Sequence, residues 1–289
     1  MWRTLLLVGA LGAVGGNAMQ GNRRKRLLGG TEATTLQFPF LVFLRVTKRN
    51  ATFVCGGTLL DTRRVLTAAH CLDGVQQPQN ITAVLGEHDY PTYEGSEQVR
   101  EVQEARPHHL YQGDPKLAAD LAILEVHEPF LVSGQLHTAT LGHEEPLIGT
   151  VCTAAGWGTT AEFGQVSPVL LMANLTVVER SRCKDAITPH RPTAVIDSSV
   201  FCAGGDGMRD TCEGDSGGPL VCGGVVAGMV SWGVGCGRLG FPGVYTSLPH
   251  WRDWITTQLN SQSDTSLPSP PPLPHYLTPA AQHVPSDAE

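Results

Sequence analysis

Eight cysteines lie along this chain of 289 residues, at positions 55, 71, 152, 183, 202, 212, 222 and 236. An even number of cysteines in an oxidising compartment predicts disulfide bonds, here four, and eight cysteines allow about 105 pairings. The chain contains no C-x-x-C pair and no H-E-x-x-H string, and structural zinc usually needs such closely spaced ligands. The cysteines therefore predict a fold closed by four internal bridges rather than a zinc-binding fold.

The amino-terminal segment MWRTLLLVGALGAVGGNAMQ is typical of a cleaved secretory signal. One arginine precedes an apolar run from Leu5 to Val14, and small residues follow up to Ala18. This run is too short to cross a bilayer, which takes about 18 residues or more, and no later run is long enough, so we expect no membrane anchor. We expect removal of residues 1–18 and a secreted, extracellular protein, with glycosylation sequons at Asn50, Asn80 and Asn174.

The charge of the chain argues against nucleic acid as a partner. The formal net charge is -7, and the first 26 residues hold five basic residues and no acidic one. Loss of these residues leaves 15 basic against 27 acidic residues, or a net charge of -12. An acidic surface repels phosphate backbones and favours the approach of positively charged substrates.

Short β-rich runs alternate with glycine, proline and polar residues from Leu27 to about Asn260, and this pattern predicts an all-β sandwich or barrel. Only residues 250–259, HWRDWITTQL, carry an apolar stripe at helical spacing, which predicts one C-terminal helix docked on the core. We expect residues 27–260 to form a single domain. The β-rich runs on which this prediction depends include residues 38–46, 81–88, 121–126, 170–178 and 225–232.

Residues 261–289 form a tail that holds seven of the twenty prolines and almost no hydrophobic pattern. A segment of this composition buries too little apolar surface to offset its ordering entropy, so we expect disorder. The run PSPPPLP also fits a polyproline ligand for an aromatic groove, which is the alternative.

The string CEGDSGGPL, residues 212–220, places Ser216 in a G-x-S-x-G pattern. This pattern fits the nucleophile elbow of an α/β-hydrolase, another serine enzyme, or a plain glycine turn. A serine hydroxyl needs a base to take its proton, and the base needs a third group to orient it. His70 in VLTAAHC and Asp120 in AADLAILEV are the candidates for these two roles.

The order of these residues along the chain separates the possible folds. An α/β-hydrolase has its histidine after its serine, but only His250 and two tail histidines follow Ser216. The order His70, Asp120, Ser216, together with TAAHC, DLAIL and GDSGGP, resembles the trypsin/chymotrypsin family of serine proteases. The resemblance extends from Leu27 to about Asn260.

The resemblance implies roles for these residues. Ser216 would be the nucleophile, His70 the general base and then acid, and Asp120 the buried carboxylate that orients His70. The backbone N–H groups of Gly214 and Ser216 would form the oxyanion hole. The implied fold is two perpendicular six-stranded antiparallel β-barrels with a short C-terminal helix. The implied disulfides are Cys55–Cys71, Cys152–Cys222, Cys183–Cys202 and Cys212–Cys236.

The resemblance also implies cleavage after arginine or lysine. Asp210, six residues before Ser216, matches the acidic base of the primary pocket in trypsin-like members, where a basic side chain gains a charge-assisted bond. Glu213 would lie at the pocket mouth and disfavour acidic residues near the scissile bond. Other positions match the pocket wall, Gly233 and Gly243, and the segment that pairs with the substrate backbone, Ser231 and Trp232.

Residues 85–98, LGEHDYPTYEGSEQ, are similar to the calcium-binding loop of trypsin. Calcium prefers six to eight oxygen ligands. The carboxylates of Glu87, Glu94 and Glu97 and the backbone carbonyls of Asp89 and Thr92 would supply them. A solvated acidic loop without an ion is the alternative.

Activation is implied at the bond between Arg26 and Leu27, which makes residues 19–26 a pro-segment. In this family the new amino terminus pairs with the aspartate before the nucleophile, here Asp215. The family usually begins with Ile-Val, and Leu-Leu departs from it by a shape change that typically costs under about 1.5 kcal/mol. Residues 23–26, Arg-Arg-Lys-Arg, resemble a proprotein convertase site, and a trypsin-like activator is the alternative.

The sequence therefore predicts a secreted, trypsin-like serine endopeptidase. The expected partners are protein or peptide substrates, an activating protease and protein protease inhibitors, and the expected state is a monomer. A catalytically inactive homologue that serves as a binding protein is the alternative. Such homologues usually lose the serine, the histidine or the oxyanion glycine, and this chain keeps all of them.

Overall fold

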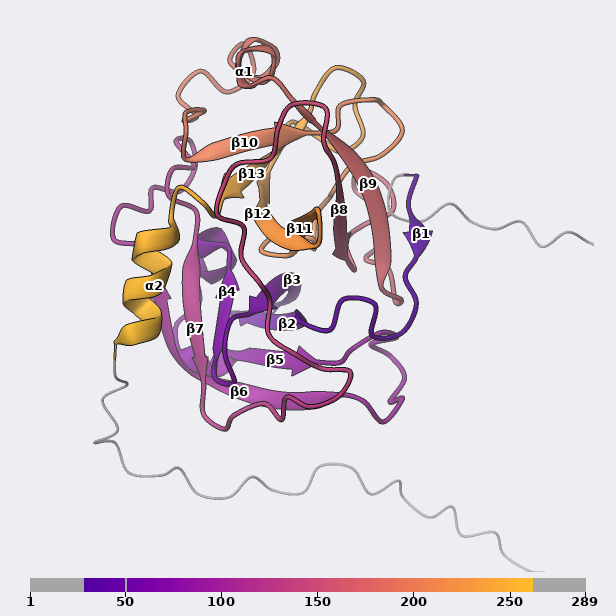
Figure 1. Ribbon diagram of the computed structural model, residues 1–289, viewed down its shortest axis with the longest axis vertical. Helices are drawn as coiled ribbons and strands as arrows, with labels where there is room; N and C mark the ends of the chain where they lie inside the picture. Colours follow the sequence, from indigo (N-terminus) through magenta and orange to yellow (C-terminus); the bar gives the residue numbers. More distant parts are fainter. Residues whose placement is uncertain (1–28, 50, 262–289) are drawn as a thin grey trace, which may run out of the picture.

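The structure is a computed structural model, and it describes residues 29–49 and 51–261. Twelve of its strands form two antiparallel barrels stacked one on the other (Figure 1). The predicted signal peptide, pro-segment and tail, with Arg26, Leu27 and Asn50, lie outside the described residues, apart from Ser261 at the start of the tail.

The first barrel closes in the order β2-β3-β4-β7-β6-β5. Apolar residues alternate or run together along these strands, so one face of each strand enters a common core. The strands are β2 (Leu41–Lys48), β3 (Ala51–Leu59), β4 (Arg64–Thr67), β5 (Ile81–Leu85), β6 (Gln98–Pro107) and β7 (Ala122–Val126).

The second barrel is a sheet of order β9-β10-β13-β12-β11-β8 that closes because β8 also pairs with β9. The two-residue strand β1 (Thr31–Glu32) adds to the outside of β9. The barrel strands are β8 (Val151–Gly156), β9 (Leu171–Val178), β10 (Val200–Ala203), β11 (Pro219–Cys222), β12 (Val225–Trp232) and β13 (Gly243–Ser247).

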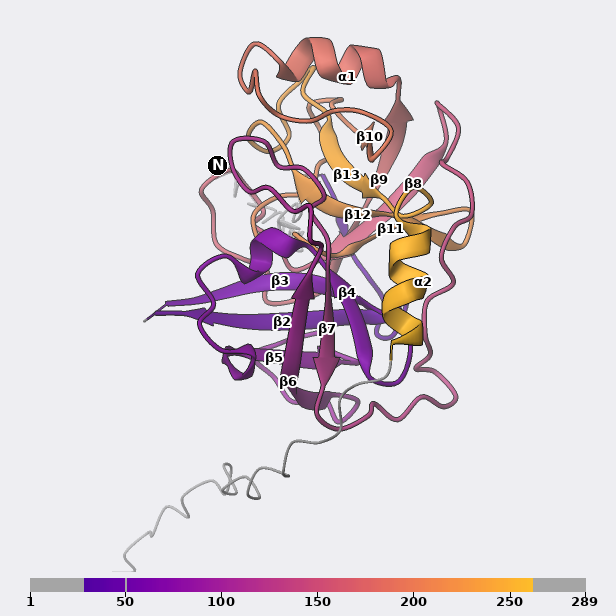
Figure 2. The same cartoon turned by 90° about the vertical axis from the view of Figure 1, so that its left-hand side faces the viewer.

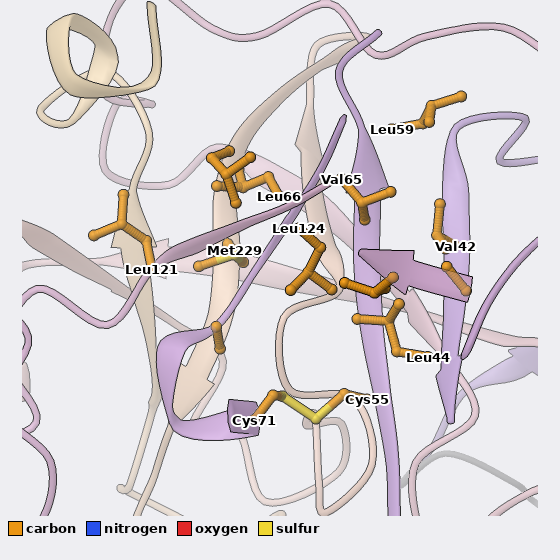
Figure 3. Close-up of a cluster of buried hydrophobic side chains, with 14 of the residues drawn as sticks. Val42, Leu44, Cys55, Leu59, Val65, Leu66, Cys71, Leu121, Leu124 and Met229 are labelled. Atoms are coloured by element: carbon orange, nitrogen blue, oxygen red, sulfur yellow. A yellow bond between two sulfur atoms is a disulfide. The ribbon is translucent and has the colours of Figure 1, made fainter. Parts of the chain in front are cut away.

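The core of the first barrel reaches into the second. Figure 3 shows this cluster of buried side chains with the Cys55–Cys71 disulfide at one edge, and Met229 of β12 among first-barrel side chains such as Leu66 and Leu124. Helix α2 (Arg252–Asn260) follows the last strand of the second barrel yet buries Ile255 in this same core. It therefore lies along the first barrel, as Figure 2 also shows, although it follows the second barrel in the chain.

The prediction of two six-stranded antiparallel barrels with a C-terminal helix is confirmed. The sequence did not reveal helix α1 (Arg180–Ile187), because its composition is mostly polar. Only Cys183 and Ile187 are buried there, one turn apart, and the Cys183–Cys202 disulfide attaches the helix to β10. Two single turns of 3-10 helix, η1 (Ala69–Leu72) and η2 (Pro78–Asn80), complete the described elements.

The disulfides join Cys55 to Cys71, Cys152 to Cys222, Cys183 to Cys202, and Cys212 to Cys236, which are the four pairs that the family resemblance implies. Within the described residues, no helix is both long and apolar enough to cross a membrane.

Candidate active site

The three residues of the predicted triad meet where the two barrels join. His70 lies in η1, directly after β4, and Asp120 lies just before β7, so the first barrel carries both. Ser216 lies in the turn that leads into β11 of the second barrel and lines a cavity of about 310 Å³. The site therefore exists only when the two barrels are docked.

Asp120 accepts two hydrogen bonds from His70. Its Oδ2 lies 2.8 Å from His70 Nδ1, and its Oδ1 accepts the backbone N–H of His70 at 2.9 Å. This pair of bonds fixes both the ring and the backbone of His70. The second ring nitrogen, Nε2, is thereby directed away from Asp120. Because Nδ1 must donate to the carboxylate, Nε2 is left without a proton and can act as a base.

The second barrel contributes further groups to Asp120, which is itself buried. The hydroxyl of Ser231 donates to Asp120 Oδ2, and Thr246 Oγ1 donates to the Asp120 carbonyl at 3.0 Å. The sequence analysis assigned Ser231 only to substrate binding and did not find Thr246, because neither lies near Asp120 in the chain. The first bond holds the carboxylate and the second holds the backbone of Asp120, both across the barrel interface.

Burial and ion pairing act against each other on this pair. Burial disfavours both charges, but the negative Asp120 and its hydrogen bond outweigh burial and raise the pKa of His70. Burial likewise opposes ionisation of Asp120, and the positive charge and hydrogen bonds of His70 outweigh it and lower the pKa of Asp120. The arrangement stabilises an imidazolium, the species that forms when His70 takes a proton.

The backbone around Ser216 packs directly on the segment that carries His70. Gly56 N–H donates to the Ser216 carbonyl at 2.7 Å, and a Cβ at Gly217 would collide with the hydroxyl of Thr67. Gly217 therefore lets the two barrels approach each other at the nucleophile.

Two backbone N–H groups beside Ser216 point to an anion site. Gly214 has φ of +97°, a conformation that only glycine adopts readily. Among the described residues, the N–H groups of Gly214 and Ser216 have no hydrogen-bond acceptor, although their neighbours Asp215 and Gly217 donate to Cys212 and Val230. Backbone donors without a partner beside a nucleophile can stabilise a developing oxyanion.

Asp210 is 4% exposed and lines the same cavity as Ser216. It accepts backbone N–H groups from Thr211 at 2.9 Å and Gly237 at 2.8 Å. Burial raises its pKa to about 7, and the two N–H donors only partly offset that effect. Asp210 has no cationic partner among the described residues, so the cavity provides a buried negative charge that a cation could neutralise.

Glycines keep the cavity open near this carboxylate. A Cβ at Gly243 would lie 3.2 Å from Asp210 Oδ1 and 3.0 Å from the Tyr245 hydroxyl, which is tighter than ordinary packing. Gly233 and Trp232 line the cavity, and the exposed Glu213 lies on its rim. The lining residues that were not foreseen include Glu162, Phe163 and Arg191.

Asp215 is fully buried beside the nucleophile. Its carboxylate accepts the N–H groups of Gly158 at 2.8 Å and Cys212 at 2.9 Å, and burial raises its pKa to about 6. No described cation pairs with it. The first described residue, Gly29, lies against the segment before Asp210, since a Cβ at Gly29 would collide with the carbonyl oxygen of Met208.

A second acidic cluster lies in the loop between β5 and β6. One carboxylate oxygen from each of Glu87, Glu94 and Glu97 lies within 4.8 Å of the others. Burial, together with the charges of Glu97 and Glu94, raises the pKa of Glu87 to about 7. Thr92 N–H donates to the Asp89 carbonyl at 2.7 Å, which makes the loop turn back on itself. The donor set consists of oxygens, which suits a hard divalent cation.

Two of the three sequons lie in the described part of the chain. Asn174 is exposed on β9 and accepts a hydrogen bond from Thr153, and Asn80 is half-buried at the end of η2.

Comparisons with known proteins agree with this geometry. The family model described as Trypsin matches residues 27–255. Human kallikrein-12 is 38% identical over 234 residues, which cover 80% of this chain and 89% of that protein. Trypsin I-P38 of Gallus gallus is 33% identical over 259 residues, which cover 89% and 98%. A solved structure of mouse neuropsin, a serine protease, has a TM-score of 0.71 and 29% identity, covering 80% of this chain and 99% of that one. The chain belongs to the trypsin family of serine proteases.

Proposed function

We propose that this protein is a secreted serine endopeptidase that cleaves peptide bonds after arginine or lysine. The observation that carries the specificity is Asp210, a buried carboxylate without a described cation, in the cavity that Ser216 lines. A substrate guanidinium or ammonium that enters this cavity replaces its lost hydration with a charge-assisted bond. A neutral side chain there would leave the carboxylate without a partner.

In the proposed reaction, Ser216 Oγ attacks the carbonyl carbon of the scissile bond while His70 Nε2 takes the hydroxyl proton. The carbonyl oxygen becomes an oxyanion and accepts the N–H groups of Gly214 and Ser216. His70 then gives its proton to the leaving amine, the C–N bond breaks, and an acyl-enzyme remains. Water repeats the sequence, with His70 as its base, and releases the carboxylic acid.

Asp120 would act through His70. Its bonds to Nδ1 and to the backbone N–H hold the ring in the tautomer that leaves Nε2 unprotonated, and its charge would stabilise the imidazolium. Ser231 and Thr246 would position Asp120 in turn.

Two measurements test this function. Covalent labelling of Ser216 by an organophosphonate distinguishes an active protease from an inactive homologue, which would not react. A peptide library, cleaved by the activated protein, gives the residue before the scissile bond. Arginine and lysine are expected there, and equal or faster cleavage after phenylalanine or leucine would reject the assignment of Asp210.

We further propose that cleavage between Arg26 and Leu27 activates the enzyme. The new amino group would pair with Asp215, whose buried carboxylate has two N–H donors and no described cation. Release from the Arg-Arg-Lys-Arg site by a proprotein convertase would deliver active enzyme from the secretory pathway. Amino-terminal sequencing of protein from cells with and without a convertase inhibitor tests the route. Leu27 at the terminus in both samples would reject the convertase.

The acidic loop is proposed as a structural calcium site, held by Glu87, Glu94 and Glu97 with the carbonyls of Asp89 and Thr92. The ion would offset three crowded negative charges and so stabilise the loop, and it has no part in the chemical step.

Secretion, glycan at the sequons, regulation by protein inhibitors and a monomeric state belong to the same proposal. Expression in cultured cells tests them together, since the enzyme should appear in the medium as a monomer whose mass falls on treatment with a glycosidase.

A further inference from the structure

Arg191 gives the cavity rim a charge opposite to that of its other ionisable residues. Among the described residues that line the cavity it is the only basic one, against Glu162, Asp210 and Glu213. Its side chain is 37% exposed, so solvent and a bound peptide can both reach it.

The guanidinium of Arg191 is only partly paired. Its Nη1 lies 2.6 Å from Asp114 Oδ1, and Asp114 is 71% exposed. In the described part of the chain the remaining donors, Nε and Nη2, have no acceptor. A guanidinium presents five donors, and a carboxylate can accept two of them side by side. Arg191 therefore keeps the capacity to bind a second carboxylate.

The backbone around Arg191 is well fixed. Its N–H donates to the Ile187 carbonyl at the end of α1, and the Val195 N–H donates to the Lys116 carbonyl in the neighbouring loop, both at 2.9 Å. The rings of His190 and Phe241 meet edge to face at 5.1 Å. A side chain held on such a support can recognise a substrate at low entropic cost.

Arg191 belongs to the part of the rim that carries Trp232. Ile187 and Ile196 flank the Arg191 segment in the chain and form a buried cluster with Val244. Trp232 packs against this cluster. Glu213 belongs to a separate part, where its carbonyl accepts the N–H of Thr159 at 2.8 Å. In the proposed function, the substrate residues before the scissile bond pair with Ser231 and Trp232 as an added strand.

We propose that Arg191 is a specificity-determining residue that binds an acidic side chain at the third or fourth substrate residue before the scissile bond. This inference rests on the proposed function, which places the basic residue over Asp210. Successive residues of an extended strand rise about 3.3 Å, so these two positions lie about 7 to 10 Å upstream of the basic residue. The preferred substrate is then a peptide with a basic residue at the cleavage point and an acidic one shortly before it.

Asp114 offers a matched control, because it is the partner of Arg191 and lies outside the proposed machinery. If the ion pair merely clamps the two loops together, Asp114→Asn and Arg191→Gln break the same clamp and must shift selectivity in the same direction. If Arg191 binds the substrate, removal of Arg191 abolishes the acidic preference, whereas removal of its competitor Asp114 strengthens it.

The test uses activated full-length protein and fluorogenic peptides acetyl-Xaa-Ala-Ala-Arg and acetyl-Ala-Xaa-Ala-Arg, with Glu, Gln or Lys at Xaa. We expect kcat/KM for Glu to exceed that for Lys by about three- to fivefold at one of these positions, the size of a half-exposed ion pair. Arg191→Gln should bring this ratio to about one, Arg191→Lys should retain part of it, and Asp114→Asn should raise it. The ratio should also fall in 1 M salt.

Each outcome has a separate meaning. Failure of the wild-type enzyme to cleave the arginine peptides would overturn the proposed function itself. Cleavage with equal rates for Glu and Lys would overturn only the role of Arg191, as would a parallel loss of the ratio in Arg191→Gln and Asp114→Asn. Thermal unfolding of each variant identifies one that does not fold, and Arg191→Lys then carries the test.

Discussion

An acidic site in the first barrel and one in the second are built differently. In the cavity of the second barrel the carboxylate of Asp210 is almost fully buried and bonded to two backbone N–H groups. The first barrel gathers three carboxylates, Glu87, Glu94 and Glu97, on one partly exposed loop. The pKa of Asp210 and that of Glu87 both rise to about 7.

The same pKa has different contributions in the two sites. Burial is the largest in both, and two nearby carboxylates add to it in each, Glu97 and Glu94 at Glu87 and Asp215 and Asp206 at Asp210. One backbone N–H donor, that of His88, opposes the rise at Glu87, against two at Asp210. At Asp210 the fixed N–H donors favour the charged form. A narrow cavity with one prepared carboxylate suits one positive charge on a long side chain, whereas three crowded carboxylates need two positive charges at one point.

The largest expected effect is at Asp210. Asp210→Asn removes the buried carboxylate of the cavity, so that a bound guanidinium would be an unpaired buried charge, which costs about 3 to 4 kcal/mol, or two to three orders of magnitude in kcat/KM for arginine substrates. Asp185→Asn, on the exposed face of α1, is the control for loss of one charge. Unchanged turnover in Asp210→Asn would remove the distinction between the two sites.

Removal of calcium should affect stability and leave the chemical step alone. A ligand present at about 100 times its Kd stabilises the folded state by about 2.7 kcal/mol, which corresponds to about 5 to 10 °C in Tm for a domain of this size. We expect chelator to lower Tm by this amount and Glu97→Gln to abolish the difference. Glu101 is exposed on β6, outside the loop, and Glu101→Gln should keep the difference in Tm with and without chelator. A midpoint that does not respond to chelator would exclude calcium.

The pH dependence separates the pocket from the triad. Acylation of Ser216 by a small neutral ester needs neutral His70, so its rate should rise with pH through a pKa above the ordinary 6.5. Arginine substrates also need ionised Asp210, whose pKa of about 7 means that charge is lost as pH falls below 7. Their kcat/KM should therefore fall more steeply on the acidic side, by up to about another tenfold per pH unit. Coincident profiles for the two substrates would contradict this account of Asp210.

The smallest effect is expected at Glu213, on the exposed rim. Glu213→Gln should raise kcat/KM for peptides with an acidic residue just after the scissile bond by about two- to threefold, because solvent screens exposed charges. The gain should shrink in 1 M salt, and peptides with glutamine at that position should not change. An equal gain for acidic and neutral peptides would show that charge repulsion is not the cause.

Local patterns in the sequence predicted much of the fold. The run 225–232 coincides with β12 because nearly all of its residues are buried, and the apolar stripe of 250–259 marks α2 because it must dock on the first barrel. The strings around His70, Asp120 and Ser216 could be found for the same reason, since each is contiguous and each has a fixed chemical requirement.

Contacts between distant segments could not be found this way. Ser231 donates to Asp120 across 111 residues of chain, and Arg191 pairs with Asp114 across 77. Neither pair leaves a periodic or compositional signal, because the barrels bring the partners together only after folding. Helix α1 was missed because a disulfide and one buried isoleucine replace the apolar stripe that usually predicts a helix.

None of the four disulfides crosses from one barrel to the other, since Cys55–Cys71 closes the first and the remaining three close the second. The joint between the barrels is therefore non-covalent, and its hydrogen bonds include those from Ser231 to Asp120 and from Gly56 to Ser216. Oxidation can finish each half on its own without aligning the nucleophile with its base. A molecule that is fully oxidised but badly docked would migrate like the native protein on a non-reducing gel and yet carry no activity, so titration of Ser216, rather than a thiol assay, is the measure of correctly assembled enzyme.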